Sequence, residues 1–541
     1  MKHNNDIFAD KVVYQIYPRS FKDTDGDGIG DLRGVIDSLD YLELLGVDMI
    51  WLTPFFVSPQ NDNGYDVADY RAIDPLFGTM ETVEELITKA KEHKIEIMLD
   101  MVLNHTSTEH EWFKKALTGD KKYMDYYFFK DTTTNWQSKF GGPAWTYVED
   151  LNLNYLHLFD TTQADLNWEN EAVFKEVCDI VNFWLDKGIT GLRFDVINLV
   201  SKPDVFEDDH VWDGRRFYTD GPRIHEHLNK LNTHTFGNRD NILTVGEMSS
   251  TSLEEGVKYA SPGRNELATI FNFHHLKVDY VDNKKWHPKA FDFIELKKIL
   301  AEWQVATQES GALLALFLNN HDQPRSVSRF GDVVDYHKES AKMLATAIQG
   351  MRGIVYIYQG EEIGLPNAEF NELKYYKDIE SLNAYETIEG DVSRKLAVLE
   401  AHSRDNGRTP MPWDNSENHG FTTGTPWLDL SHSKALVSVE DSLKDPDSIF
   451  YHYQKLIQYR KQYPSWSLGS IEFIDLDHPQ IFAYTRTLDD EVLLFVHNFY
   501  KEEVEYKLPA VGTLILSNYK DTKLEKEMRM KPFESIVMKL A

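Results

Sequence analysis

Short apolar runs alternate with amphipathic stretches along most of the chain. Eight runs rich in Val, Ile, Leu, Tyr and Phe predict buried strands at residues 12–17, 48–54, 95–105, 189–197, 241–248, 267–275, 313–320 and 354–360. Between them, apolar residues three and four positions apart predict helices at 31–46, 80–94, 172–188, 293–304 and 338–351. Continuous apolar strands covered by helices indicate a parallel sheet, and eight such units predict an α/β fold with a (β/α)8 TIM barrel.

Two regions depart from this alternation. More than sixty residues rich in Tyr, Trp, Asn and Gly follow the third strand, which is too long for a loop and predicts a small inserted domain. After residues 450–463 only short β-like runs remain, so we predict a C-terminal antiparallel β-sandwich domain. The stretch from about 365 to 450 is polar and irregular, so we predict only that it is a long segment after the eighth strand. The predicted domains are the barrel (1–103 and 172–467), the inserted domain (104–171) and the C-terminal β domain (468–541).

The charge balance limits the partners of the chain. It has 88 acidic and 57 basic residues, a formal charge of −31, which argues against nucleic acid or an anionic membrane as a general partner. Its one cysteine, Cys178, excludes an internal disulfide. The first ten residues lack the apolar core of a signal peptide, and no run approaches the ~20 apolar residues of a membrane span. We therefore expect a cytoplasmic protein, as a monomer or weak oligomer.

Several polar side chains stand at or just beyond the C-terminal ends of predicted strands, namely Asp100, His105, Asp195, Glu247, His321 and Asp322. Closure of the barrel would bring these strand ends to one rim, where TIM barrels carry their chemistry. Two carboxyls on opposite sides of a bond can cleave a glycoside, and a third can stabilise the oxocarbenium-like transition state. Arg193 would share a strand face with Asp195 and keep it ionised as a nucleophile. Glu247 would need a raised pKa to act as the acid.

Four segments, "DMVLNH", "GLRFDVIN", "TVGEM" and "NNHDQPR", resemble in order the signature regions of the α-amylase family of glycoside hydrolases. Two more, "DNGYDVADY" and "RDNGRTPMPWD", are similar to the oligo-1,6-glucosidase branch of that family. The resemblance implies that Asp195 is the nucleophile, Glu247 the acid/base and Asp322 the transition-state stabiliser. The glucosyl unit would be held by a further set of residues, namely Tyr65, Asp66, His105, Arg193, His321 and Arg408. An Asp66–Arg408 pair would close the non-reducing end and give exo-action.

Other segments resemble the group within that branch whose members hydrolyse α,α-trehalose 6-phosphate to glucose and glucose 6-phosphate. They are residues 134–145, 155–171, 213–228, 245–252 and 271–280. This resemblance implies a small phosphorylated disaccharide as the substrate. A phosphate in the leaving-group site needs cations, and basic residues follow the fourth and sixth strands at Arg215, Arg216, Arg223, Lys277 and Lys285. Lys277, directly after "HHL", is the first choice.

Three other functions remain open. The chain could be an oligo-1,6-glucosidase acting on isomaltose-type α-1,6 ends. A sucrose isomerase is disfavoured because "PRSVSRF" at 324–330 shows no extra arginine cluster to hold the second sugar. A catalytically dead barrel serving as a scaffold is disfavoured because all three acids are present.

The stretch "DTDGDGIGD" at 23–31 predicts a structural Ca²⁺ site. Its alternating acids, a backbone carbonyl and a further carboxylate would form a cage of hard oxygens from Asp23, Asp25, Asp27, Ile29 and Asp31. The stretch begins like an EF-hand loop, but Gly34 stands where the bidentate glutamate should be. Members of the resembled family carry Ca²⁺ in a similar loop, and no organic cofactor is expected.

Overall fold

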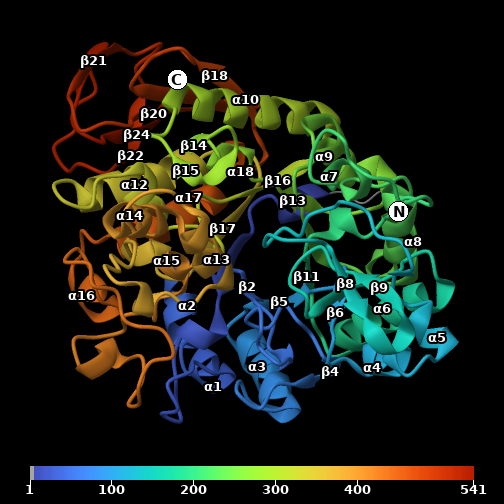
Figure 1. Ribbon diagram of the computed structural model, residues 1–541. Helices are drawn as coiled ribbons and strands as arrows, with labels where there is room; N and C mark the ends of the chain where they lie inside the picture. Colours follow the sequence, from blue (N-terminus) through green and yellow to red (C-terminus); the bar gives the residue numbers. More distant parts are fainter. Residues whose placement is uncertain (1–4, 541) are drawn as a thin grey trace. The chain divides into compact units, whose positions relative to one another are not determined.

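The computed structural model describes residues 5–540 and contains the predicted barrel (Figure 1). Its strands close in the order β1 (Val12–Ile16), β17 (Ile354–Tyr358), β16 (Leu313–Leu316), β13 (Thr269–Phe271), β12 (Leu243–Glu247), β11 (Gly191–Phe194), β5 (Glu96–Met101) and β2 (Met49–Leu52). Each strand lies inside one of the eight predicted runs. The (β/α)8 fold is therefore confirmed.

The barrel strands are apolar because they are buried on both faces. Every residue of β1 and β17 is buried, and both strands consist mostly of Val, Ile and Tyr. Parallel pairing fixes which residues lie level with one another at the strand ends. In β5 and β11 the register pairs Asp100 with Arg193, so these two polar residues lie side by side on neighbouring strands.

Most of the predicted helices are present, as α3 (Met80–Glu92), α6 (Glu171–Asp186), α10 (Phe293–Ser310) and α12 (His337–Gln349). Thr79 caps α3 through a capping box, and Gly311 ends α10 in the left-handed conformation. The helical pattern predicted at 31–46 is present as two helices, α1 (Leu32–Ile36) and α2 (Leu39–Leu45). The break lies at Ser38, whose hydroxyl bonds to the carbonyl of Gly34.

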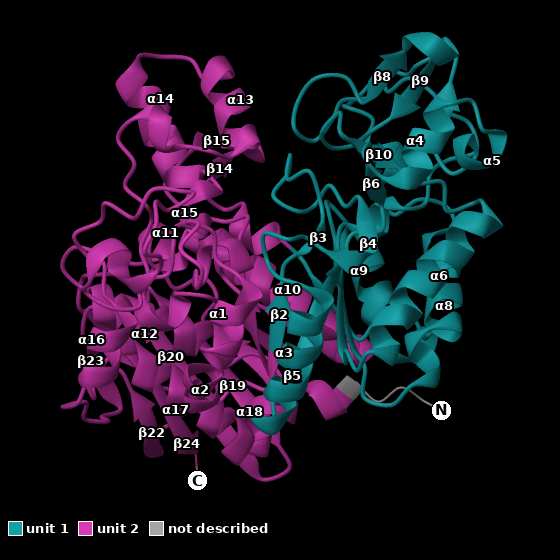
Figure 2. Cartoon of the chain, turned by 90° about the horizontal axis from the view of Figure 1, so that it is seen from below, with its two compact units in different colours: residues 1–3, 50–272 teal, residues 4–49, 273–541 magenta. Residues whose placement is uncertain are grey.

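The chain divides into two compact units, coloured separately in Figure 2. Among the described residues, the first unit comprises 50–272 and the second 5–49 with 273–540. The domain boundaries predicted at 104, 172 and 468 stay predictions.

The first unit contains β5, β11, β12, β13 and all of β2 except Met49, together with a separate set of small sheets. Within residues 104–171, β6 (His105–Ser107) pairs with β10 (Gln163–Asp165), and a three-stranded sheet has the order β7 (Phe129–Lys130), β9 (Leu153–Leu156) and β8 (Trp145–Val148). Trp136 is fully buried in an apolar cluster beside them. The remaining helices of this unit are α4 (Glu111–Leu117), α5 (Lys121–Met124), α7 (Arg215–Tyr218), α8 (Ile224–His234) and α9 (Leu253–Ala260).

The second unit ends in the predicted antiparallel β domain. Its five-stranded sheet has the order β18 (Ser470–Ile474), β19 (Ile481–Leu488), β20 (Glu491–Asn498), β24 (Ser535–Leu540) and β22 (Thr513–Ser517). A second sheet pairs β21 (Val504–Lys507) with β23 (Glu527–Met530), and one apolar cluster contains residues of both sheets. The strand β23 has the sequence EMRM and does not stand out as a β-like run.

Two buried arginines of the second unit bind main-chain carbonyl groups. Arg460, on α17 (Ile449–Gln462), donates to the carbonyls of Ala9, Gln349, Met351 and Gly353. Arg486, on β19, donates to those of Gly350, Trp466, Ser467 and Gly469. Each guanidinium therefore fastens several chain segments at once.

The polar excursion after the eighth strand is not a loop. It forms α13 (Ile379–Thr387), α14 (Val392–His402), α15 (Asp405–Arg408) and α16 (Val439–Lys444). Asp378 and Asp391 cap α13 and α14 through their side chains. This segment positions two arginines of the candidate site.

Candidate active site

In the first unit, a single guanidinium binds three carboxylates. Arg193 on β11 is 1% exposed, and its Nη1 donates to Asp100 Oδ1 and Asp195 Oδ1, each at 2.6 Å. Its Nη2 donates to Glu247, the last residue of β12. The planar fork of arginine suits such multiple pairing. Two of the three predicted acids, Asp195 and Glu247, are thus brought together on the same cation.

Burial controls the ionisation of these acids. It raises the pKa of Asp195 to about 6; Arg193 opposes this shift, and the negative charge of Asp100 adds to it. Burial likewise raises the pKa of Asp100 to about 6 against the opposing charge of Arg193. Arg193 favours the ionised form of Asp195, as expected, but burial has the larger effect on its pKa. With a pKa near 6, Asp195 is still mostly ionised at neutral pH.

The chain turns sharply just after Asp195. Val196 is buried and has a φ of 36°, in the left-handed region that β-branched residues rarely adopt. The backbone N–H of Asp195 donates to the carbonyl of Met101 at 3.1 Å, so the acid is anchored at the end of β11. Strained conformations of this kind cluster at functional sites.

Three predicted sugar-binding residues belong to the same unit as this cluster. Tyr65 donates its hydroxyl to Asp100 Oδ2 at 3.0 Å, and His105 Nε2 lies 3.0 Å from the carbonyl of Tyr65. Burial lowers the pKa of His105, which favours its neutral form. Asp66 is fully buried between β3 (Phe56–Val57) and β4 (Asp69–Ile73) and accepts from the hydroxyl of Ser58 at 2.9 Å. These three residues are fixed before any sugar binds.

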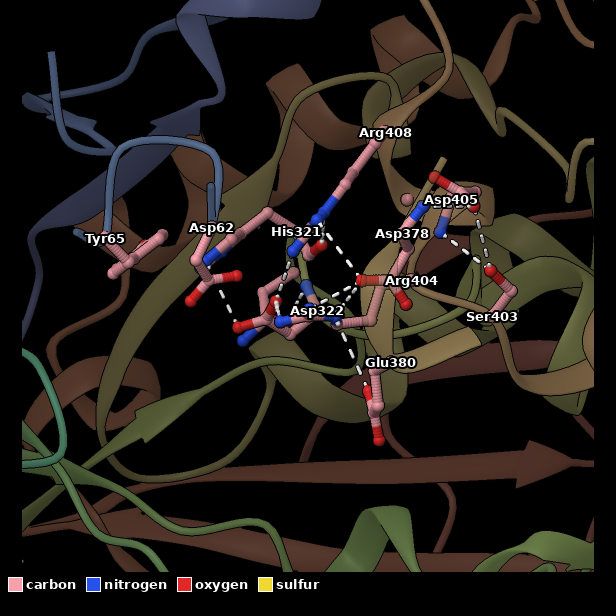
Figure 3. A network of polar contacts seen from close by, with 12 residues as sticks. Asp62, Tyr65, His321, Asp322, Asp378, Glu380, Ser403, Arg404, Asp405 and Arg408 are labelled. Carbon is pink, nitrogen blue, oxygen red and sulfur yellow. Dashed lines mark hydrogen bonds and ion pairs between the residues drawn. The ribbon is translucent and has the colours of Figure 1, made fainter. Parts of the chain in front are cut away.

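In the second unit, Asp322 is held by two arginines (Figure 3). Its Oδ1 accepts from Arg408 Nη2 at 2.7 Å and from Arg404 Nη1 at 3.3 Å, and His321 Nε2 lies 3.2 Å from Oδ2. Arg408 also donates to the carbonyl of His321 at 2.9 Å. Asp322 belongs to the other unit, so its meeting with Asp195 and Glu247 stays a prediction, as does the Asp66–Arg408 pair.

Sequence reasoning missed Arg404 and its partner Asp378. Arg404 donates to Asp378 Oδ1 from Nε at 2.8 Å and from Nη2 at 2.5 Å. Burial alone would raise the pKa of Asp378, but the charges of Arg404 and Arg408 hold it well below its ordinary value. Arg404 opens the motif "RDNGRTPMPWD" and could have been found there. Asp378 lies in the polar stretch that carried no periodic signal.

The basic residues predicted to bind phosphate are mostly in ion pairs. Lys285, on β15 (Lys284–Pro288), lies 2.6 Å from Glu380. Arg223 pairs with Glu169 and Asp204, both at 2.7 Å. Arg216 lies 3.1 Å from Asp209, and Arg215 pairs with Asp213. Lys277 is half-buried and ends the short 3₁₀ turn at His274–Leu276.

The predicted metal loop places three of its five residues together. Carboxylate oxygens of Asp23, Asp25 and Asp27 all lie within 4.8 Å of one another. Burial raises the pKa of Asp27, and the neighbouring acids add to this shift. A cation would offset that repulsion, so the donor set fits Ca²⁺. Asp31 caps α1 by accepting from Gly34 N at 2.7 Å, and it also accepts from Thr24. The parts of Asp31 and of the Ile29 carbonyl in the metal site stay predictions.

The chain is similar to known proteins over nearly its whole length. Residues 15–469 match the α-amylase catalytic domain, and residues 481–537 match the α-amylase SusG C-terminal domain. The chain is 50% identical to trehalose-6-phosphate hydrolase of Bacillus subtilis (strain 168), across 98% of this chain and 97% of that one. It is 44% identical to oligo-1,6-glucosidase of Parageobacillus thermoglucosidasius, across 98% and 99%. The crystal structure of Bacillus licheniformis trehalose-6-phosphate hydrolase superposes with a TM-score of 0.95 at 49% identity, covering 99% of both chains.

Proposed function

Because the chain belongs to the α-amylase family of glycoside hydrolases, we propose that it is a retaining exo-α-glucosidase that hydrolyses α,α-trehalose 6-phosphate to glucose and glucose 6-phosphate. The observation that carries the chemistry is the shared pairing of Asp195 and Glu247 with Arg193. The choice of substrate is supported by relatives with this activity in their names, at 50% and 48% identity.

The reaction uses two displacements at the anomeric carbon. Asp195 attacks this carbon and forms a β-glucosyl-enzyme, while Glu247 gives its proton to the departing oxygen of glucose 6-phosphate. Glu247, now ionised, then takes a proton from water as the water attacks the same carbon. Because the carbon is inverted twice, the glucose leaves in the α configuration.

Asp322 supplies negative charge that stabilises the oxocarbenium-like transition state. Arg404 and Arg408 donate hydrogen bonds to its carboxylate and hold it in place, as the network in Figure 3 shows. Tyr65 stacks beneath the glucosyl ring. The hydroxyl groups of that sugar are bound by His105, Arg193, His321, Asp66 and Arg408. The Asp66–Arg408 pair closes the non-reducing end and makes the enzyme exo-acting.

The phosphate lies on the leaving sugar, and the basic residues of the rim are its proposed partners. Lys277 remains the first choice among those identified from sequence. Arg216, Arg223 and Lys285 would have to exchange a carboxylate for the phosphate, which lowers their contribution. A charged sugar phosphate does not cross membranes unaided, which supports the proposed cytoplasmic location. Among the described residues, no helix is both long enough and apolar enough to span a membrane.

The substrate is tested by measuring glucose release from α,α-trehalose 6-phosphate, trehalose and isomaltose side by side, with Asp195→Asn as the blank. A higher kcat/KM for the phosphorylated sugar is expected. A preference for isomaltose would instead support the oligo-1,6-glucosidase alternative, which the relative at 44% identity favours. If the protein turned over none of the three sugars and no activated α-glucoside, only the hypothesis of a catalytically inactive scaffold would remain.

We also propose that Asp23, Asp25 and Asp27 hold a structural Ca²⁺ ion. A ligand that binds only the folded state at 100 times its Kd adds about 3 kcal/mol of stability. The melting temperature should therefore fall when a chelator replaces calcium, and bound calcium should be close to one per chain. The double variant Asp25→Asn/Asp27→Asn should lose both the bound ion and the response. An unchanged melting temperature with no bound calcium contradicts the proposal.

A further inference from the structure

The leaving sugar must lie beside the chain that follows Glu247. In the proposed reaction this residue protonates the oxygen of the leaving group, so glucose 6-phosphate contacts it directly. Glu247 ends β12, and Ser249 is two residues further on, which places the two Cα atoms at most about 7 Å apart. Side chains around Ser249 therefore lie close to the predicted acid/base.

A lysine from a distant part of the sequence reaches Ser249. The Nζ of Lys139 donates to the hydroxyl of Ser249 at 3.0 Å. Lys139 is half-buried, its ammonium lies 5.5 Å from the ring centre of Tyr218, and its backbone N–H bonds to the carbonyl of Leu158 at 2.8 Å. The lysine is thus anchored in the inserted region while its charge points at the loop after the acid/base.

The loop that carries Ser249 is fixed by side-chain hydrogen bonds to its backbone and to Thr251. Asn198 accepts from the backbone N–H of Ser249 at 2.9 Å and donates to its carbonyl at 3.0 Å. Thr251 donates its hydroxyl to Asp220 at 2.7 Å, and Ser250 has a φ of 61°. Hydroxyl groups fixed in this way need little further ordering when they bind a ligand.

This contact joins two of the segments that set the chain apart in sequence, residues 134–145 and 245–252. We propose that Lys139 and Ser249 bind the phosphate of the leaving sugar, and this proposal rests on the proposed function. An ammonium is a strong point-charge donor to phosphate, and a serine hydroxyl adds a second donor.

The experiment compares two substrates in Lys139→Met. The kcat/KM for α,α-trehalose 6-phosphate should fall about tenfold to hundredfold, mainly through KM, as expected for loss of a charge-assisted hydrogen bond. Turnover of p-nitrophenyl α-glucoside, which lacks the phosphate, should stay unchanged. Lys139→Arg should recover part of the loss, and Ser249→Ala should show a smaller loss of the same kind. The matched control is Lys130→Met, an exposed lysine of the same region.

Inhibition by products gives a second readout that does not need the natural substrate. Glucose 6-phosphate should inhibit Lys139→Met more weakly than the unaltered enzyme, whereas inhibition by glucose should not change. An equal loss on both substrates would mean that Lys139 only ties two segments together, and it would overturn the proposal. So would a variant that keeps its full preference for the phosphorylated sugar. If the unaltered enzyme itself shows no such preference, the proposed function fails first, whatever Lys139 does.

Discussion

At the scale of single residues, the main feature is the imbalance of charge around Arg193. One guanidinium faces Asp100, Asp195 and Glu247, so full ionisation would leave two negative charges uncompensated by it. Burial makes such charge costly, and the pKa values of Asp100 and Asp195 are accordingly raised to about 6. Groups this close titrate together, so a pH profile reports the cluster.

Replacing Asp100 with Asn should move the acid limb of kcat/KM to lower pH. Asp195 must be ionised to attack, and the negative charge of Asp100 is one cause of its raised pKa. Without that charge, ionisation of Asp195 is easier and activity persists to lower pH, although the absolute rate falls because Arg193 loses a partner. The measurement is kcat/KM for p-nitrophenyl α-glucoside against pH. Asp131→Asn, at an exposed position, serves as the control, and an upward shift of the limb in Asp100→Asn would refute the argument.

At the scale of elements, a buried ion pair connects the inserted region to the segment after β11. Lys202 Nζ lies 2.6 Å from Asp165 on β10, and both side chains are 0% exposed. Lys202 also donates to Asn104 Oδ1 at 2.8 Å, and Asn104 lies next to His105 in sequence. The pair therefore holds the β6–β10 ribbon, and with it His105, against the barrel segment of the same unit.

Lys202→Met should destabilise the protein strongly, by about 3–5 kcal/mol, since it leaves Asp165 charged, buried and without its cation. The double variant Lys202→Met/Asp165→Leu should recover part of that loss, because both charges are then removed. Denaturant unfolding of the two variants and of Asp165→Leu provides the test. A double variant less stable than Lys202→Met would count against this account.

The elements also show which parts of the structure the sequence could predict. The eight barrel strands were predictable because strands buried on both faces are continuous apolar runs bounded by polar residues. The strand ends then located Asp195, Glu247 and Asp322 without any knowledge of side-chain contacts. The break at Ser38 was not predictable, since the apolar spacing continues across it.

A polar strand and several long-range side-chain contacts could not be predicted from the sequence. The strand β23 has the sequence EMRM, too polar to stand out as an apolar run. The pairing of Arg404 with Asp378 and that of Lys139 with Ser249 join residues 26 and 110 positions apart. No local periodicity reports such contacts. Three-dimensional packing was needed to show that Lys285, Arg223 and Arg216 are already in ion pairs.

At the scale of the whole molecule, the net charge of −31 makes stability depend on ionic strength. Like charges repel in the compact state, and salt screens them. Raising monovalent salt from about 20 mM to about 200 mM shortens the Debye length from roughly 20 Å to roughly 7 Å. The melting temperature at neutral pH should rise over this range. Near the isoelectric point the response should shrink, and a falling melting temperature at neutral pH would show that screened ion pairs outweigh the repulsion.

The hydrogen bonds from Arg460 and Arg486 to main-chain carbonyls determine which positions can change in evolution. Every amino acid presents a carbonyl, so a codon change at Gln349, Met351 or Ser467 leaves the acceptor for Arg460 or Arg486 in place. A codon change at either arginine removes a planar set of donors that lysine cannot reproduce. These hydrogen bonds therefore tolerate substitution at the positions that supply the carbonyls. They do not tolerate substitution of Arg460 or Arg486.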